Sequence, residues 1–215
     1  MILPVYRFVA WLVKVLLQIF WRFRVVDAEK VPLAGPVILA CNHVSYFDPP
    51  VLGCALRRPV RYMAKQELFT IPLLGPFIRA LGAYPVDRSR HTGAAVKRSL
   101  EMLQTGAAIG IFPEGTRNLD GSVKPHVGAA LLASKSGAAV VPAWVDGTAQ
   151  AGRFHRIAVI YGDPIRFDPA QKASREDLAK WTEEIMARIH ALRGALGDDS
   201  KGGKTRPQGG TEPSS

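Results

Sequence analysis

Short apolar runs alternate with stretches of helical pattern from residue 23 to residue 196. Short runs rich in Val, Ile and Ala are typical of buried strands, and the stretches between them have the apolar spacing of helices. This alternation predicts an α/β domain with a mixed, largely parallel sheet flanked by helices. The predicted strands are 23–26, 36–41, 60–63, 84–86, 107–112, 140–145 and 157–161. The predicted helices that follow the first strand are 49–56, 73–81, 93–103, 128–136 and 175–196.

Length and composition fit one globular domain. The chain has 215 residues, of which 47% are hydrophobic, enough for a single sizeable core. We therefore assign residues 25–196 to one α/β domain. Residues 197–215 are rich in Gly, Pro, Ser and charge, so this tail is predicted to be disordered. The two cysteines, Cys41 and Cys54, indicate neither a disulfide framework nor a zinc site, which favours a reducing compartment.

Residues 1–24 have the pattern of an amphipathic helix. Arg7, Lys14, Gln18 and Arg22 are separated by steps of seven, four and four, which places them along one stripe of a helix over 4–22. The rest of the helix surface is apolar and rich in Phe and Trp. We expect this helix to lie in a membrane interface and anchor the domain there. The alternatives are a helix packed on the protein's own core and a helix that spans the bilayer.

The net charge also favours a lipid partner. The chain has a formal charge of +10, and residues 1–24 contain four Arg or Lys residues and no Asp or Glu. A basic and apolar segment suits the anionic surface of a bilayer. Nucleic-acid binding is disfavoured, because the charge accompanies membrane-type aromatic residues and no nucleic-acid-binding motif is present. The sequence thus predicts a peripheral or monotopic protein at the cytoplasmic face of the cell membrane.

His43 and Asp48 stand in the segment NHVSYFDP, where one predicted strand ends and a helix begins. A histidine can take the proton from a hydroxyl group while its oxygen attacks an acyl carbonyl. A tight turn can bring Asp48 back to the ring, where its carboxylate would orient the imidazole and stabilise the charged form. An acyl thioester is already activated, so no serine nucleophile is required. The alternative role of Asp48 is a helix N-cap followed by Pro49 in the first turn.

A second polar segment, FPEGTR, ends another predicted strand. Gly115 lets the backbone approach an anion closely, Thr116 supplies a hydroxyl, and Arg117 can bind a phosphate through two parallel hydrogen bonds. With Glu114, these residues are predicted to form a phosphate-binding loop, unless Glu114 and Arg117 only pair with each other in an exposed turn. Arg88, just past a short predicted strand, is a candidate second phosphate ligand or an exposed charge.

Four motifs occur in the order and approximate spacing of the lysophospholipid acyltransferase family, which the sequence resembles over roughly residues 30–165. They are His43 with Asp48, the pair Asp87-Arg88, the FPEGTR segment, and the pair Val141-Pro142. Any one motif can arise by chance, whereas four in order are specific.

The resemblance implies roles for individual residues. His43 and Asp48 would form the catalytic dyad, and Arg88 with the 114–117 run would hold the phosphate of the acyl acceptor. Pro142 would shape the acyl-donor side, and the N-terminal helix would be the membrane anchor. The sequence departs from the family pattern in PVDR, which ends at Arg88, and in VKPH, which ends at residue 126. These departures affect the expected identity of the acyl acceptor more than the expected type of reaction.

The resemblance also implies a reaction. A fatty acyl group would pass from acyl-CoA or acyl carrier protein to the 2-hydroxyl of 1-acyl-glycerol-3-phosphate (lysophosphatidic acid), giving phosphatidic acid without a metal or cofactor. The same chemistry on glycerol-3-phosphate or another lysolipid is the nearest alternative. Two others are a non-enzymatic module that binds anionic lipid and a hydrolase that uses Cys41 as its nucleophile. The hydrolase is disfavoured, because Cys41 lies in a run with the pattern of a buried strand.

Overall fold

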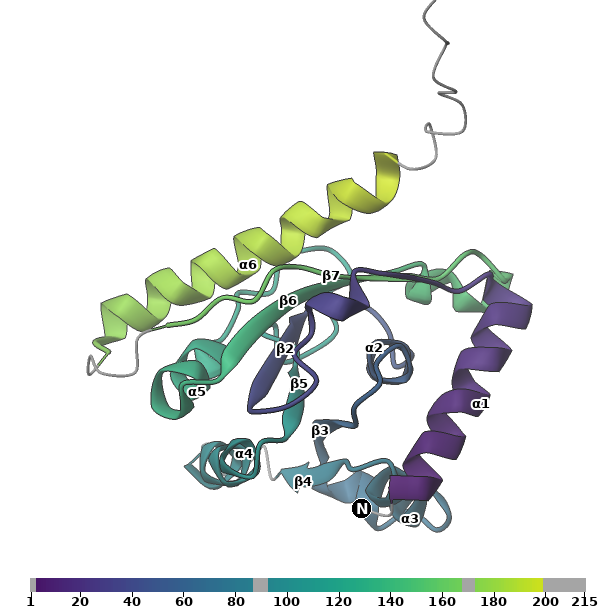
Figure 1. Ribbon diagram of the computed structural model, residues 1–215, viewed down its shortest axis with the longest axis horizontal. Helices are drawn as coiled ribbons and strands as arrows, with labels where there is room; N and C mark the ends of the chain where they lie inside the picture. Colours follow the sequence, from purple (N-terminus) through teal and green to yellow (C-terminus); the bar gives the residue numbers. More distant parts are fainter. Residues whose placement is uncertain (1–2, 87–92, 168–172, 199–215) are drawn as a thin grey trace, which may run out of the picture.

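The computed structural model describes residues 3–86, 93–167 and 173–198. Within these residues, seven strands form one sheet in the order β1-β7-β6-β2-β5-β3-β4 (Figure 1). Neighbouring strands are parallel except β6 and β7, which are antiparallel. The predicted mixed, largely parallel sheet is confirmed. The strands are β1 (Arg24–Val26), β2 (Val37–Cys41), β3 (Val60–Lys65), β4 (Tyr84–Val86), β5 (Ala108–Ile111), β6 (Ala139–Asp146) and β7 (Ala158–Tyr161).

Helices cover both faces of the sheet. One face is covered by α2 (Asp48–Cys54), against which α1 (Leu3–Trp21) packs, and the other by α4 (Gly93–Gln104), α5 (Gly128–Ser136) and α6 (Arg175–Asp198) (Figure 1). Successive side chains of β2 point alternately to the two faces. Leu39 and Cys41 join the apolar core beneath α1 and α2, whereas Ile38 and Ala40 join the core beneath the other three helices. β2 is therefore the buried centre of the domain.

The predicted elements agree with the structure to within two residues at each end. The short helix α3 (Leu74–Ala80), which precedes β4, is among them. Three short 3₁₀ helices were not predicted: η1 (Ala28–Lys30), η2 (Gln66–Phe69) and η3 (Thr148–Arg153). The last of these carries a residue of the site described below, and the second contributes to the wall of the cavity beside it. The tail predicted to be disordered lies outside the described residues from position 199 onward.

The helix α1 packs on the domain along one face and leaves the opposite face in contact with solvent. Tyr6 and Leu17 are buried against the domain, while the side chains of Phe8, Trp11 and Ile19 are 61%, 59% and 67% exposed. In the described part of the chain, α1 is also the one helix that is long and apolar enough to cross a membrane, by length and composition alone. The helix α1 is thus packed on the protein's own core, as one of the alternatives proposed, and it also has an apolar face that the domain does not cover.

Candidate active site

Two loops meet at the carboxyl edge of the sheet. β2 ends at Cys41 and β5 ends at Ile111, and the two strands are parallel neighbours with Ala40 opposite Ile111. The segments that follow the two strands therefore emerge side by side, which is the usual position of ligand sites in open α/β sheets. Two hydrogen bonds join them. The His43 N–H donates to Glu114 Oε2 at 2.9 Å, and the Asn118 N–H donates to the His43 carbonyl at 2.7 Å.

His43 and Asp48 are in direct contact, as the sequence predicted. His43 Nδ1 lies 2.8 Å from Asp48 Oδ2, and the Asp48 side chain has no exposed surface. An ionised carboxylate only accepts hydrogen bonds, so Nδ1 carries the proton and Nε2 is left as the basic nitrogen. The ring is 16% exposed and stacks on Phe112 with a centroid distance of 4.2 Å. The imidazole is thus fixed in position while keeping limited access to solvent.

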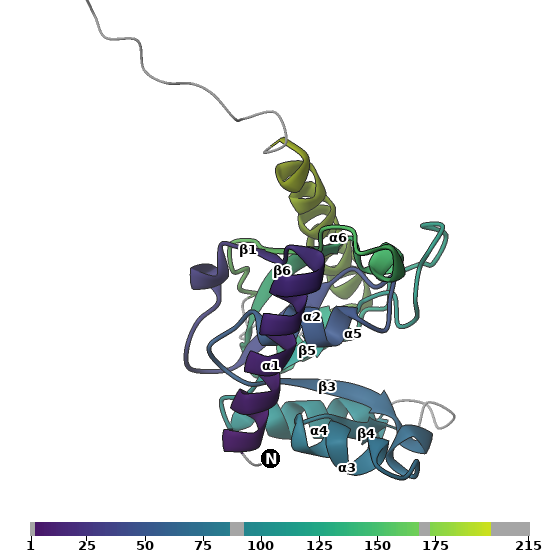
Figure 2. The ribbon, with the colours of Figure 1, turned by 90° about the vertical axis from the view of Figure 1, so that its right-hand side faces the viewer.

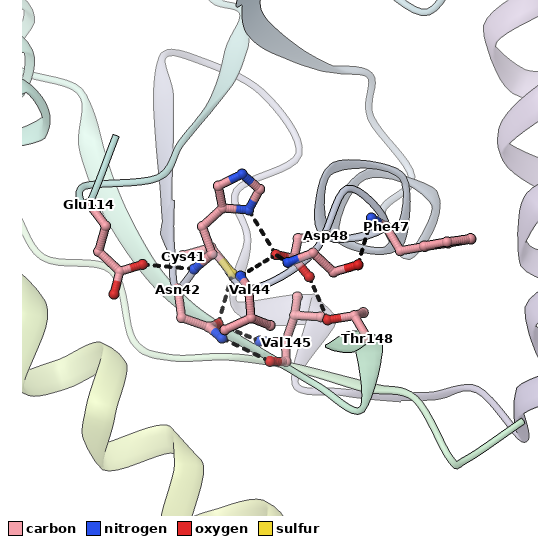
Figure 3. A network of polar contacts seen from close by, with 10 residues as sticks. Cys41, Asn42, Val44, Phe47, Asp48, Glu114, Val145 and Thr148 are labelled. Atoms are coloured by element: carbon pink, nitrogen blue, oxygen red, sulfur yellow. Dashed lines mark hydrogen bonds and ion pairs between the residues drawn. The ribbon is translucent and has the colours of Figure 1, made fainter. Parts of the chain in front are cut away.

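Asp48 is held by more than the histidine. Its Oδ2 also accepts the backbone N–H groups of Val44 and Ser45, at 2.7 and 2.8 Å. The Thr148 hydroxyl, at the start of η3, donates to Oδ1 at 2.6 Å (Figure 3). Four donors therefore satisfy a fully buried carboxylate, which would otherwise be costly to ionise.

The N-cap role considered for Asp48 is wrong. Asp48 is the first residue of α2 and Phe47 is its N-cap, with no side-chain cap bond. The Asp48 carboxylate turns back toward the preceding loop instead of binding the first amides of α2. Only the proline in the first turn matches that alternative.

Glu114, predicted as part of the phosphate loop, holds the His43 loop in place. Its carboxylate is 5% exposed, and its two oxygens accept the His43 N–H and the Asn118 side-chain amide, the latter at 2.8 Å. In Figure 3 Glu114 lies on the opposite side of Asn42 and Val44 from Asp48. Both Glu114 oxygens thus have partners within the protein, and a carboxylate repels phosphate. We assign Glu114 a positioning role, and direct contact with substrate stays a prediction.

Asn42 and Thr148 are positioning residues that sequence reasoning did not assign. The Asn42 side chain forms two hydrogen bonds with the backbone of Val145, at 2.8 and 3.0 Å, and so ties the His43 loop to β6. Asn42 belongs to the NHVSYFDP segment, but no sequence pattern indicated that its side chain binds the backbone of Val145. Thr148 lies one hundred positions from Asp48, in a segment without a strong pattern, so no sequence signal indicated it.

The phosphate loop itself is exposed. Gly115 has φ +68°, and a Cβ there would lie 2.8 Å from His126 Cδ2, so the turn requires glycine. Thr116 and Arg117 are both exposed. The Arg117 guanidinium lies 4.0 Å above the Tyr46 ring, not in the ion pair considered from the sequence, and this stacking places it beside the His43 loop.

Arg88 lies outside the described residues, but the strand before it is described. β4 ends at Val86, which pairs with Lys65 at the end of β3, so both strands finish at the same edge of the sheet as the His43 loop. Lys65 is exposed. Sequence reasoning assigned Lys65 no role, and the topology brings it to the site edge.

Cys41 is unsuited to act as a nucleophile. Its side chain has no exposed surface, and burial, followed by the nearby Asp48 carboxylate, raises the pKa of the thiol well above its usual value. A buried protonated thiol reacts poorly, which disfavours the cysteine hydrolase. In the described parts of the chain, no three His, Cys, Asp or Glu side chains gather in a way that could hold a metal ion.

An apolar cavity of about 550 Å³ adjoins the His43 loop. It lies between α1, α2, β3 and α3, and Tyr46 and Phe47 belong to both the cavity wall and the His43 loop. Tyr46 thus contacts Arg117 on one side and the cavity on the other. The deeper wall includes Tyr6, Gly53, Cys54 and Tyr62. The volume and apolar lining of the cavity suit a hydrocarbon chain.

Comparisons with known proteins agree with this geometry. The family described as Acyltransferase matches residues 22–146. The chain is 33% identical to the 1-acyl-sn-glycerol-3-phosphate acyltransferase of Bacillus subtilis over 196 residues, which cover 89% of this chain and 98% of that protein. It is 27% identical to the enzyme of the same name from Streptococcus pneumoniae over 172 residues, 77% of this chain and 64% of that protein.

A solved structure has the same fold. The crystal structure of the 1-acyl-sn-glycerophosphate acyltransferase PlsC from Thermotoga maritima superposes with a TM-score of 0.64 and 27% identity, over 81% of this chain and 72% of that one. Residues 22–146, which match the family, contain the His43 loop and the phosphate loop. The chain therefore belongs to the acyltransferase family and is an enzyme of the glycerolipid acyltransferase type.

Proposed function

We propose that the protein transfers a fatty acyl group from acyl-CoA or acyl carrier protein to the 2-hydroxyl of 1-acyl-glycerol-3-phosphate, forming phosphatidic acid. The observation that carries the proposal is the position of the His43–Asp48 pair. The loop that carries this pair contacts the exposed Arg117, which suits a phosphate, and also forms part of the wall of an apolar cavity, which suits an acyl chain. The names of the relatives point to the same acceptor.

The chemistry follows from the proton on Nδ1. His43 Nε2 accepts the proton of the acceptor hydroxyl as its oxygen attacks the thioester carbonyl carbon. Asp48 stabilises the imidazolium that forms. The tetrahedral intermediate then collapses, the carbon–sulfur bond breaks, and the imidazolium returns its proton to the leaving thiolate. The ester bond forms, the thioester bond is lost, and His43 ends in its starting state.

Binding of the acceptor phosphate is assigned to the basic groups at the same edge. The exposed Thr116 offers a hydroxyl donor and Arg117 offers a planar pair of N–H groups, while Gly115 forms the turn that presents them and its own N–H donates to the Phe112 carbonyl. Arg88 and Lys65 would add charge from the ends of β4 and β3. In this arrangement the phosphate is held a short distance from His43, which places the 2-hydroxyl at the base.

Membrane attachment through α1 completes the proposal. The exposed apolar face of α1 would lie in the cytoplasmic leaflet, where the lysolipid acceptor is embedded and the water-soluble donors arrive from the cytoplasm. The cavity between α1 and α3 would receive an acyl chain directly from that side.

A panel of acceptors tests the function. The purified protein would be incubated in detergent with a labelled acyl thioester and, in separate reactions, lysophosphatidic acid, glycerol-3-phosphate, lysophosphatidylcholine and monoacylglycerol, and the products read by mass spectrometry. We expect phosphatidic acid to form fastest. If another acceptor is acylated faster, that acceptor replaces lysophosphatidic acid as the proposed substrate, and the proposed reaction stays the same. Lipid binding without transfer to any acceptor from either donor would leave only the lipid-binding module.

A further inference from the structure

An apolar surface continues beyond both ends of α1. The exposed apolar side chains of α1 continue in Phe154, which contacts Phe20 near the end of α1, and in α3 and the turn before it, which carry the exposed Ile71, Leu73 and Phe77. Figures 1 and 2 show α3 close to the start of α1, and in Figure 1 the segment after β6 reaches its end. We call Leu73 and Phe154 the two tips of this surface.

The Leu73 tip is held outward by its backbone. Leu73 has φ +65° and ψ −46°, and the Leu74 N–H donates to the Pro72 carbonyl at 2.8 Å, which defines a tight three-residue turn. Residues other than glycine rarely adopt this conformation. The side chain is 87% exposed, so no packing within the protein compensates for the strained turn.

The Phe154 tip has the same two properties. Phe154 has φ +52° in the left-handed region, and its side chain is 62% exposed. Its ring contacts the rings of Phe20 and Trp21, at centroid distances of 6.1 and 5.5 Å, so it extends the apolar surface of α1 at its last turn. A large apolar side chain is thus presented to the outside at each end of the helix.

The charges around this surface fit an anionic bilayer. Segments 3–24, 70–84 and 148–157 contain no Asp or Glu, and they carry seven Arg and Lys residues. Each basic residue near an anionic surface favours binding, and their side chains reach polar headgroups while apolar neighbours enter the acyl region. The seven are Arg7, Lys14, Arg22, Arg24, Arg79, Arg153 and Arg156.

Both ends of α1 are fastened to the domain, so the helix cannot cross the bilayer alone. Near its start the Tyr6 hydroxyl accepts the Val60 N–H at 3.1 Å, and at its end the Trp21 indole N–H donates to the Ala151 carbonyl at 2.6 Å. A helix held on the domain near both ends meets a bilayer side-on. Leu16 and Phe77 are exposed and also line the cavity, so the cavity opens onto this surface.

We propose that Leu73 and Phe154 insert into an anionic bilayer at the two ends of α1, so that α1 lies flat and the domain is held in one orientation. Three segments that are distant in sequence form one docking surface. Its cavity opening then faces the lipid phase. The proposal concerns binding to the bilayer and does not depend on which acceptor is acylated.

Vesicle sedimentation tests the two tips. The full-length protein and its Leu73→Ser, Phe154→Ser and double variants would be mixed with vesicles of phosphatidylcholine and phosphatidylglycerol, and with pure phosphatidylcholine vesicles. We expect the partition coefficient on the anionic vesicles to fall about tenfold for each tip. Leu33→Ser is the matched control, because Leu33 is 67% exposed but lies outside the three segments. Its partition should equal that of the wild type.

A second variant separates binding from folding. Leu73→Gly removes the apolar side chain and relieves the positive φ, so the melting temperature should rise or stay constant while vesicle binding falls. All tip variants should keep the wild-type activity on detergent-dispersed substrate. Equal vesicle binding by the wild type and the double variant would overturn the proposal. The proposal would also be overturned if sedimentation velocity shows a dimer for the wild type and a monomer for the double variant, while vesicle binding is the same for both. This surface would then join two copies of the chain.

Discussion

The hydroxyl of Thr148 lies 2.6 Å from Asp48 Oδ1, and so a residue one hundred positions further along the chain holds the carboxylate that orients His43. The His43 loop is thereby tied to η3, which begins at Thr148, two residues after the end of β6. The contact is buried on both sides, with Asp48 at 0% and Thr148 at 2% exposure. The position of His43 therefore depends on how η3, which follows β6, packs against the His43 loop.

Thr148→Val is expected to lower both stability and turnover. Valine has nearly the shape of threonine but leaves Asp48 Oδ1 without its donor, which costs roughly 1.5–3 kcal/mol of unfolding free energy for a charged group. Urea denaturation measures this loss, and steady-state kinetics should show a reduced kcat with little change in KM. Thr148→Ser restores the hydroxyl and should recover most of both. An unchanged kcat in a folded valine variant would show that this hydrogen bond does not position the dyad.

His43→Ala should abolish turnover and leave the fold intact. The general base contributes roughly 10²–10⁴-fold to the rate, and the partly exposed His43 ring stacks on Phe112 in a loop at the edge of the sheet. Asp48→Asn should also lose most of the activity, because an amide cannot stabilise the imidazolium. Thioester turnover measures the rate, and circular dichroism with vesicle binding checks the fold. A folded His43→Ala protein with wild-type kcat would refute the mechanism.

Arg117→Ala should chiefly weaken binding of a phosphorylated acceptor. A charged hydrogen bond to phosphate is worth about 1.5–3 kcal/mol, so KM for lysophosphatidic acid should rise on the order of ten- to a hundredfold. Arg117 is exposed and its guanidinium stacks on the Tyr46 ring, so the fold should tolerate the change. Monoacylglycerol, which has no phosphate, serves as the comparison acceptor. The phosphate role fails if both acceptors are affected equally.

Gly53→Leu should shift the preference to shorter acyl chains. Gly53 lines the cavity, and a Cβ there would already lie 3.2 Å from the Tyr62 hydroxyl and 3.4 Å from that of Tyr6. A leucine therefore has to occupy cavity volume that a chain would otherwise fill. The ratio of kcat/KM for octanoyl and palmitoyl thioesters should rise relative to the wild type. A constant ratio in a folded variant would mean that the reacting acyl chain does not enter this cavity.

Neither cysteine should react with a thiol reagent in the folded protein. Burial raises the pKa of the Cys54 thiol to about 12 and that of Cys41 well above its usual value, so both stay protonated at about pH 8. Labelling should appear only as the protein unfolds in denaturant, which mass spectrometry can follow. Cys41→Ser should keep the acyl transfer activity. Loss of transfer in a folded Cys41→Ser protein would revive the cysteine-dependent alternative.

The sequence alone determined the order and type of the main elements and the two loops that carry the chemistry. β2 and β5 could be predicted because a strand buried on both faces is apolar at every position, and this pattern is local. His43 and Asp48 could be paired because a five-residue turn limits how far apart they can lie. The amphipathic stripe of α1 was also legible, because helical spacing depends only on neighbours along the chain.

Only the tertiary structure decided what surrounds these residues. The partnership of Asp48 with Thr148, the positioning role of Glu114 and the cavity between α1 and α3 all join segments far apart in sequence. Such contacts depend on strand order and on which helix covers which face, and a single sequence carries no local pattern for either. The same holds for α1, whose apolar arc the fold divides into one side packed on the domain and another left exposed.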